Sequence, residues 1–146
     1  MIHELRTETQ ETGIAAEVSR MVVEWSKATG IKAEFTASGE DRSLPVLASH
    51  NLRSVLSEAL QNVRKHASAS QVTVSVELLR GEVRLEIADN GKGIAYSAAE
   101  VYSLTSKGKY GISGMKERVE QLNGQFSIDS SHGTRLVISV PLTPAK

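Results

Sequence analysis

Two segments in the N-terminal half of the chain carry apolar residues at helical spacing. In Ile14–Thr29 the apolar side chains recur every three or four positions and Gly30 follows directly, which predicts a helix closed by a glycine cap. Residues 48–66 predict a longer helix, and its apolar stripe consists of Leu52, Val55, Leu56, Ala59, Leu60 and Val63. Between the two helices, the alternating residues 32–36 predict a short strand and the polar residues 38–45 predict a loop.

The period changes from helical to alternating after residue 70. Apolar and polar residues alternate on both sides of Arg80-Gly81, which predicts an antiparallel hairpin with one buried face. Residues 89–111 are rich in Gly, Ser and Lys and predict a long loop with one short helical stretch at residues 98–104. An amphipathic helix is expected next, with Gly124 as its end. A second hairpin around His132-Gly133 is predicted to close the chain, with these inward positions: Phe126, Ile128, Leu136, Ile138 and Val140.

This order of elements predicts the fold class. Hairpins grouped together, with helices between them, favour an α+β fold: a two-layer sandwich in which helices cover one face of a mixed, mostly antiparallel sheet. A regular alternation of strands and helices, as in a Rossmann fold, does not fit. The length of 146 residues suits one domain, so we expect residues 1–146 to form a single unit.

Composition and charge exclude several classes of protein. Lys+Arg and Asp+Glu both count 17, and this balance argues against a nucleic-acid-binding module, which normally carries a basic excess. The chain has no cysteine, so disulfides, thiolate zinc sites and Cys nucleophiles are excluded, and a reducing compartment is expected. No apolar run approaches the roughly 20 residues of a transmembrane helix.

The first candidate site lies on the long predicted helix. Glu58, Asn62, Lys65 and His66 are spaced by three and four residues, so we expect them to project from a common side of the helix, next to its apolar stripe. A carboxylate, an amide oxygen, an ammonium group and an imidazole grouped in this way suit a magnesium ion and the phosphates that it bridges. A solvated helix face with incidental side-chain pairs is the alternative.

Two glycine-rich stretches are the other candidates. Asp89 stands at a strand end and is followed by Gly91 and Gly93, whose lack of a side chain allows a ligand to approach the backbone closely; a plain Asn-Gly turn is the alternative. Gly111 and Gly114 open the later helix, where free N–H groups can bind an anion, although a mobile loop explains them equally well. No Walker A pattern occurs, which excludes a P-loop enzyme.

Taken together and in order, these motifs resemble those of a known superfamily. Glu58-x-x-x-Asn62-x-x-Lys65-His66, Asp89-x-Gly91-x-Gly93, Gly111-x-x-Gly114 and Gly133-Thr134 are similar to the nucleotide-binding signature of the GHKL ATPases. The run from Tyr110 to Val119, with Leu122-Asn123-Gly124, indicates a narrower group within this superfamily. It resembles the catalytic and ATP-binding domain of sensor histidine kinases that serve LuxR/NarL-type response regulators. The resemblance covers roughly residues 14–142.

The resemblance implies a role for each matching residue. Asn62 would coordinate Mg²⁺, with Glu58 on the same metal or orienting the acceptor. Lys65 and His66 would reach phosphate oxygens, and Gly111 and Gly114 would cradle them. Asp89 would accept a hydrogen bond from the adenine amine, with Thr134 beside it and Gly91 and Gly93 making room for the base. Residues 95–110 would form the ATP lid, in which Lys109-Tyr110-Gly111 stands where several relatives carry Gly-His-Gly.

The implied reaction moves the ATP γ-phosphoryl to a histidine of a separate dimerisation domain in two-component signal transduction. Residues 1–13 are expected to be the remnant of the connection to that domain, and His3 only imitates an acceptor box because one helix, without a partner, follows it. The isolated chain is expected to be a cytoplasmic monomer that binds ATP and Mg²⁺ and no nucleic acid. Its parent would be a homodimer, compatible with an inner-membrane sensor, that acts on a LuxR/NarL-type regulator. The alternatives are an anti-sigma-factor-type serine kinase of the same fold and a scaffold that binds no nucleotide.

Overall fold

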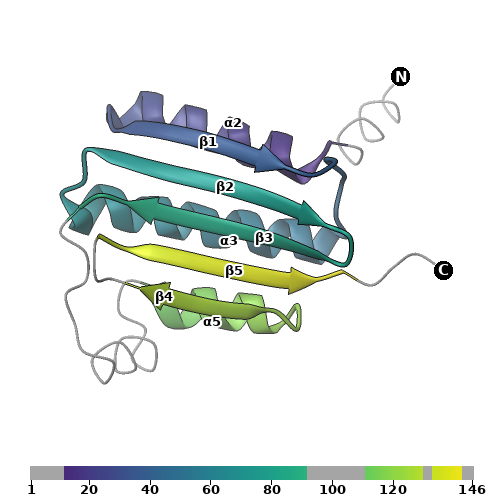
Figure 1. The fold of residues 1–146 in the computed structure, drawn as a ribbon. Coiled ribbons are helices and arrows are strands. Elements are labelled where there is room, and N and C mark those ends of the chain that lie inside the picture. The colour runs from purple at the N-terminus through teal and green to yellow at the C-terminus, as the bar shows by residue number, and fades with distance from the viewer. Residues whose placement is uncertain (1–11, 92–110, 130–132, 143–146) are drawn as a thin grey trace, which may run out of the picture.

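The computed structural model describes residues 12–91, 111–129 and 133–142, and these form two layers (Figure 1). One layer is a five-stranded sheet with the strand order β1-β2-β3-β5-β4. The other layer consists of the helices α2 (Ile14–Thr29), α3 (Val46–Asn62) and α5 (Ile112–Glu120), which all lie on the same face of the sheet. The predicted α+β sandwich is therefore confirmed.

The sheet is mixed because one of its connections contains a helix. β1 (Lys32–Ser38) runs parallel to β2 (Gln71–Leu79), and α3 lies between them in the chain, as a parallel pair requires. β3 (Glu82–Asp89), β5 (Arg135–Pro141) and β4 (Gln125–Asp129) pair antiparallel, and both predicted hairpins are present. Val74 lies opposite Ile87 and Leu85 lies opposite Ile138, so the inward positions of neighbouring strands form one apolar layer.

The hydrophobic core lies between the sheet and the helices. The largest side chains that are almost fully buried include Ile14, Leu52, Leu56, Leu85, Ile112, Met115 and Ile138. The other face of the sheet carries charged pairs. Two of them cross between strands, Arg84 with Glu77 at 3.2 Å and Arg135 with Glu86 at 2.7 Å, and Arg84 also contacts Glu82 of its own strand at 3.0 Å. Within the described residues, no helix is long and apolar enough to cross a membrane.

The long helix differs from its prediction at both ends. It begins at Val46, two residues earlier than expected. The prediction missed Val46 and Leu47 because they are 84% and 53% exposed and lie outside the buried stripe that periodicity detects. It ends at Asn62 and continues as a π-helical turn, Val63–Ala67, which stops at Ser68 in the left-handed region. The spacing of apolar residues does not distinguish a single π-helical turn from an α-helical one, so the sequence pattern did not reveal it.

The first helix matches its prediction and carries a cap that the sequence pattern does not reveal. Gly30 closes α2 with φ +78° and donates its N–H to Ser26 O at 2.8 Å. At the other end, the Asp41 carboxylate accepts hydrogen bonds from the N–H groups of Ala15 (2.9 Å) and Ala16 (3.2 Å). A carboxylate at a helix N-terminus satisfies free N–H groups and complements the helix dipole. The loop before α3 therefore holds the start of α2.

Candidate functional site

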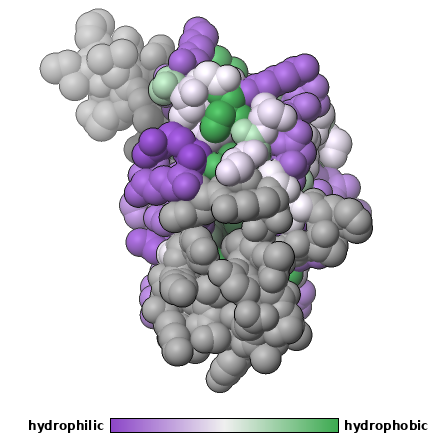
Figure 2. All heavy atoms as spheres, turned by 90° about the vertical axis from the view of Figure 1, so that its left-hand side faces the viewer, coloured by the Kyte–Doolittle hydropathy of each residue, from purple (hydrophilic) through white to green (hydrophobic). Residues whose placement is uncertain are grey.

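Elements that carry the predicted site residues converge on one end of the sheet, on the left of Figure 1. β3 ends there at Asp89, β5 begins there after Thr134, α3 ends there and α5 begins there. Figure 2 looks onto this end, where hydrophilic side chains flank a smaller apolar area. The fold thus brings together three motifs that are far apart in the sequence.

Asp89 is a buried carboxylate held by backbone groups. It is 8% exposed, and its Oδ1 accepts a hydrogen bond from the N–H of Gly91 at 2.8 Å. Its own N–H donates to Thr134 O at 2.9 Å, so the two chain segments are fixed against each other. Burial raises the pKa of Asp89, and backbone hydrogen bonds from Gly91 and Thr134 oppose that rise. A buried acceptor with capacity to spare can recognise an amino group of a ligand.

Gly133 contacts Asp89 more closely than any side chain would allow. Its φ is +78°, and a Cβ built at this position would collide with the carbonyl oxygen of Asp89 and lie 3.3 Å from Oδ1. Only glycine fits here, because the backbone conformation and the close approach both exclude a side chain. The sequence motif included Gly133, but its role in packing against Asp89 follows only from the structure.

Asn90 is a further residue that sequence reasoning did not single out. Its Oδ1 accepts hydrogen bonds from the N–H groups of Ser70 and Gln71, each at 3.0 Å, and its Nδ2 donates to Ser70 Oγ at 3.0 Å. These bonds join the end of β3 to the start of β2 beside Asp89. Asparagine commonly bonds to backbone groups at turns, which is the one local signal that could have identified it.

Glu58 of α3 lies against the start of α5. A Cβ added to Gly111, whose φ is +68°, would approach Glu58 Oε2 to 2.5 Å, so the carboxylate sits directly over the first residue before the helix. Asn62 is half-buried one turn further along α3. The structure therefore joins the first predicted motif to the third, with an acidic group beside a helix N-terminus.

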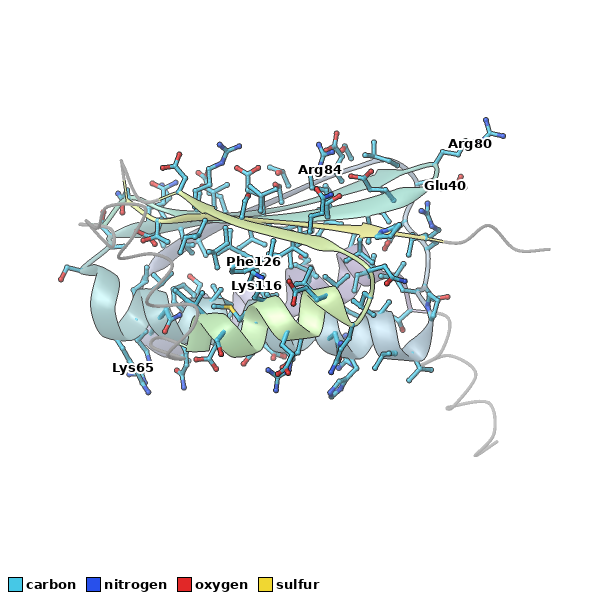
Figure 3. All side chains as sticks on the ribbon, turned by 90° about the horizontal axis from the view of Figure 1, so that it is seen from below. Glu40, Lys65, Arg80, Arg84, Lys116 and Phe126 are labelled. Carbon is cyan, nitrogen blue, oxygen red and sulfur yellow. The ribbon has the colours of Figure 1, made fainter. Side chains whose placement is uncertain are left out.

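Lys65 stands apart from this contact. It lies in the π-helical turn and is exposed, and Figure 3 shows its side chain extending away from the sheet. The common orientation of Glu58, Asn62 and Lys65 was predicted from α-helical spacing, and the π-helical turn after Asn62 replaces that spacing. The side chain of His66 is outside the described part of the structure.

Of the remaining predicted glycines, Gly114 is in the described part of the structure and Gly93 is not. Gly114 lies within α5, where an added Cβ would meet only the flexible end of Arg118 at 3.2 Å, so the fold itself does not require glycine there. Gly93, Lys109, the predicted lid at residues 95–110 and its short helical stretch lie outside the described residues.

An open groove of about 490 Å³ lies between α2 and α3. It is lined by Met21 on α2 and by His50, Arg53, Ser54, Ser57 and Glu58 on α3. Glu58 therefore borders both this groove and the start of α5. In the described part of the chain, no three His, Cys, Asp or Glu side chains gather closely enough to form a metal site of their own. A metal at Glu58 would thus need ligands of other kinds, such as an amide oxygen, a phosphate or water.

Comparison with known proteins defines the class to which this site belongs. Residues 48–144 match the family of histidine kinase-, DNA gyrase B- and HSP90-like ATPases, and the chain belongs to this family. The ATP-binding domain of PrrB from Mycobacterium tuberculosis has the same fold, with a TM-score of 0.73 at 20% identity over 92% of this chain and 97% of that one.

The relatives narrow the class to sensor histidine kinases. The chain is 34% identical to the signal transduction histidine-protein kinase/phosphatase DegS of Brevibacillus brevis over 98% of its own length and 36% of that protein. It is 36% identical to the sensor histidine kinase YhcY of Bacillus subtilis, over 100% of its length and again 36% of the relative. The chain thus spans about a third of these proteins. Family and relatives support an ATP-binding catalytic domain of the histidine kinase type, and the resemblance inferred from the motifs is confirmed.

Proposed function

We propose that this domain binds ATP and Mg²⁺ at the convergent end of the sheet and transfers the γ-phosphoryl group to a histidine on a separate dimerisation domain. The observation that carries the proposal is the pairing of two features at one end of the fold. One is a buried carboxylate, Asp89, packed against Gly133 at a position where no residue with a side chain fits. The other is the start of α5 beside Glu58.

The adenine end of the site would be formed by Asp89. Its carboxylate would accept a hydrogen bond from the exocyclic amine. Thr134 would lie beside the base, and Gly91 and Gly93 would leave room for it. The fixed backbone around Asp89 supports this role, because the acceptor is held in place before a ligand arrives. Guanine carries a carbonyl at the corresponding position and would meet the carboxylate with an acceptor instead of a donor.

The phosphate end would be formed by α3 and α5. Asn62 and Glu58 would hold Mg²⁺, Lys65 and His66 would reach phosphate oxygens, and Gly111 and Gly114 would accommodate the phosphates at the start of α5. Carboxylate and amide oxygens are ligands that fit Mg²⁺, and this metal supplies charge neutralisation on the phosphates when it is bound. The N–H groups in the first turn of α5 have no acceptor within the helix and lie beside Glu58, which supports a Mg²⁺-bound anion at this point.

In the proposed reaction, an imidazole nitrogen of the acceptor attacks the γ-phosphorus in line with the leaving oxygen. A nitrogen–phosphorus bond forms, the bond to the β-phosphate oxygen breaks, and ADP leaves. The residues of this chain mainly position the nucleotide and offset its charge, as is usual for phosphoryl transfer. Residues 1–13 would connect to the acceptor domain, the parent protein would be a homodimer in a membrane-linked or free sensor, and its partner would be a LuxR/NarL-type response regulator.

The test is incubation with labelled ATP, with and without a histidine-bearing helical hairpin from a related kinase. Acid-labile, base-stable label on the hairpin, and none on the chain alone, is the expected result. Label on an added anti-anti-sigma protein that survives acid would instead identify a serine kinase. Label on the chain that disappears in His3→Gln would show that His3 is an acceptor and contradict the assignment of residues 1–13.

A further inference from the structure

Asn51 is a buried polar residue of α3 that the site described above does not use. It is 3% exposed, and among the described residues only Asp89 shares its status as a buried polar or charged side chain. Its Nδ2 donates to Arg118 O at 2.9 Å and to Gln121 Oε1 at 3.0 Å. Both acceptors lie at the C-terminal end of α5, on the neighbouring helix.

The bond to Arg118 O completes the end of α5. In the last turn, Gln121 N bonds to Glu117 O, Leu122 N and Gly124 N bond to Val119 O, and Asn123 N bonds to Glu120 O. None of these backbone N–H groups donates to the Arg118 carbonyl, which accepts its hydrogen bond from the Asn51 amide instead. The final carbonyls of a helix have no partner within the helix, so a side chain from α3 caps α5.

The two contacts between α3 and α5 have matched spacing. Asn51 and Glu58 are seven residues apart on α3, and Gly111 and Arg118 are seven residues apart in and before α5. Seven residues are about two helical turns, or about 10.5 Å along a helix, so Asn51 and Glu58 lie on one face of α3. Asn51 meets the end of α5 and Glu58 meets its start, so the helices run antiparallel and are joined at two points in register.

We propose that Asn51 is a positioning residue that sets the axial position of α5 and thereby places its N-terminus against Glu58. This inference rests on the proposed nucleotide site, because it assigns the phosphate end of that site to the start of α5. Asn51 touches no part of the site and acts only through α5. The adenine end, at Asp89 and Gly133, belongs to β3 and the β5 side of the sheet and does not depend on this bond.

The experiment compares Asn51→Leu, which keeps a similar volume and removes both donated bonds, with a destabilised control. Val76→Ala in β2 is the control, because Val76 is 2% exposed in a strand remote from α5 in the sheet order and its truncation lowers stability without touching Arg118. Affinities for ATP and for adenosine are measured by calorimetry at a temperature where all variants are folded. We expect Asn51→Leu to lose about tenfold or more in ATP affinity and less than twofold in adenosine affinity, with the control unchanged for both ligands.

Equal losses for ATP and adenosine, or no loss for either in folded Asn51→Leu, would overturn the proposal. If Asn51→Leu does not fold, Asn51→Ala replaces it in the same comparison. A second measurement, amide hydrogen exchange, needs no nucleotide. In the Asn51 variant, exchange of residues 116–120 should accelerate more than exchange of the strand amides. In Val76→Ala, the two groups of amides should accelerate by the same factor. A wild-type chain that binds no ATP would contradict the proposed function, and the exchange data would still decide the role of Asn51.

Discussion

Gly133 and Asp89 are in close contact at the proposed adenine end of the site, and Gly133→Ala tests what this contact contributes. Two costs are expected. An alanine at φ +78° has a left-handed backbone, which costs roughly 1–2 kcal/mol relative to glycine. Its Cβ would also overlap the Asp89 carbonyl, and relieving an overlap in a packed region costs about 1–3 kcal/mol. The free energy of unfolding should therefore fall by about 2–5 kcal/mol.

Gly30→Ala is the matched control for this substitution. Gly30 has the same φ of +78°, but a Cβ there meets nothing within 4 Å. Its variant should carry the backbone cost alone, about 1–2 kcal/mol. Urea unfolding of both variants gives the two free energies, and calorimetry with ATP gives the effect on binding. Moving the Asp89 carbonyl shifts the side chain attached to the same residue, so Gly133→Ala should bind ATP at least tenfold more weakly while Gly30→Ala binds it normally.

Equal stability losses in the two variants would show that the Gly133 contact relaxes without cost. Normal ATP affinity in folded Gly133→Ala would show that the position of Asp89 does not govern nucleotide binding, which contradicts the assignment of the adenine site.

Three further predictions concern the same site. GTP should bind more weakly than ATP by about 1–3 kcal/mol, because the buried Asp89 carboxylate would lose its donor, and equal affinities in calorimetry would refute the role of Asp89. Asn62→Ala should abolish the magnesium dependence of nucleotide binding and all phosphotransfer while circular dichroism shows an intact fold; transfer at the wild-type rate would place the metal elsewhere. Burial raises the pKa of Asp89 in the folded state, so its contribution to stability is greatest below the ordinary pKa of 3.8 and is lost as the pH rises through the folded-state value. The stability of the wild type relative to Asp89→Asn should therefore decline across that window in denaturation curves taken at a series of pH values, and a constant difference would contradict the burial effect.

The sequence predicted those parts of the fold that local patterns determine. α2 and both hairpins have the expected positions, because an apolar face repeats through each of them and a glycine or an Arg-Gly turn marks where they end. The π-helical turn after Asn62 was missed because it differs from an α-helix in its backbone hydrogen bonds, which the spacing of apolar residues does not report. The capping of α2 by Asp41 and of α5 by Asn51 was also missed, since each depends on residues 25 or more positions away.

The sequence motifs identified residues of the candidate site, but they did not reveal how those residues contact one another. Asp89 and Glu58 could be named because several motifs, each weak alone, occur together in the order that the GHKL ATPases show. The contact of Glu58 with Gly111 and that of Gly133 with Asp89 require knowledge of which strands and helices are neighbours. Asn90 and Asn51 were not singled out because an asparagine in a turn or helix carries no signal of its partners.

The cap that Asp41 places on α2 has a mechanical consequence. The loop between β1 and α3 fixes the start of α2 at the end of the sheet opposite Asp89, so Gly13 and the proposed nucleotide site lie at opposite ends of the domain (Figure 1). α2 alone has 16 residues and is about 24 Å long. A rigid turn of about 15° at the start of α2 would move its far end by about 6 Å. A rotation of the whole domain about this junction would therefore displace the end that carries Asp89 much further than the end that carries Asp41.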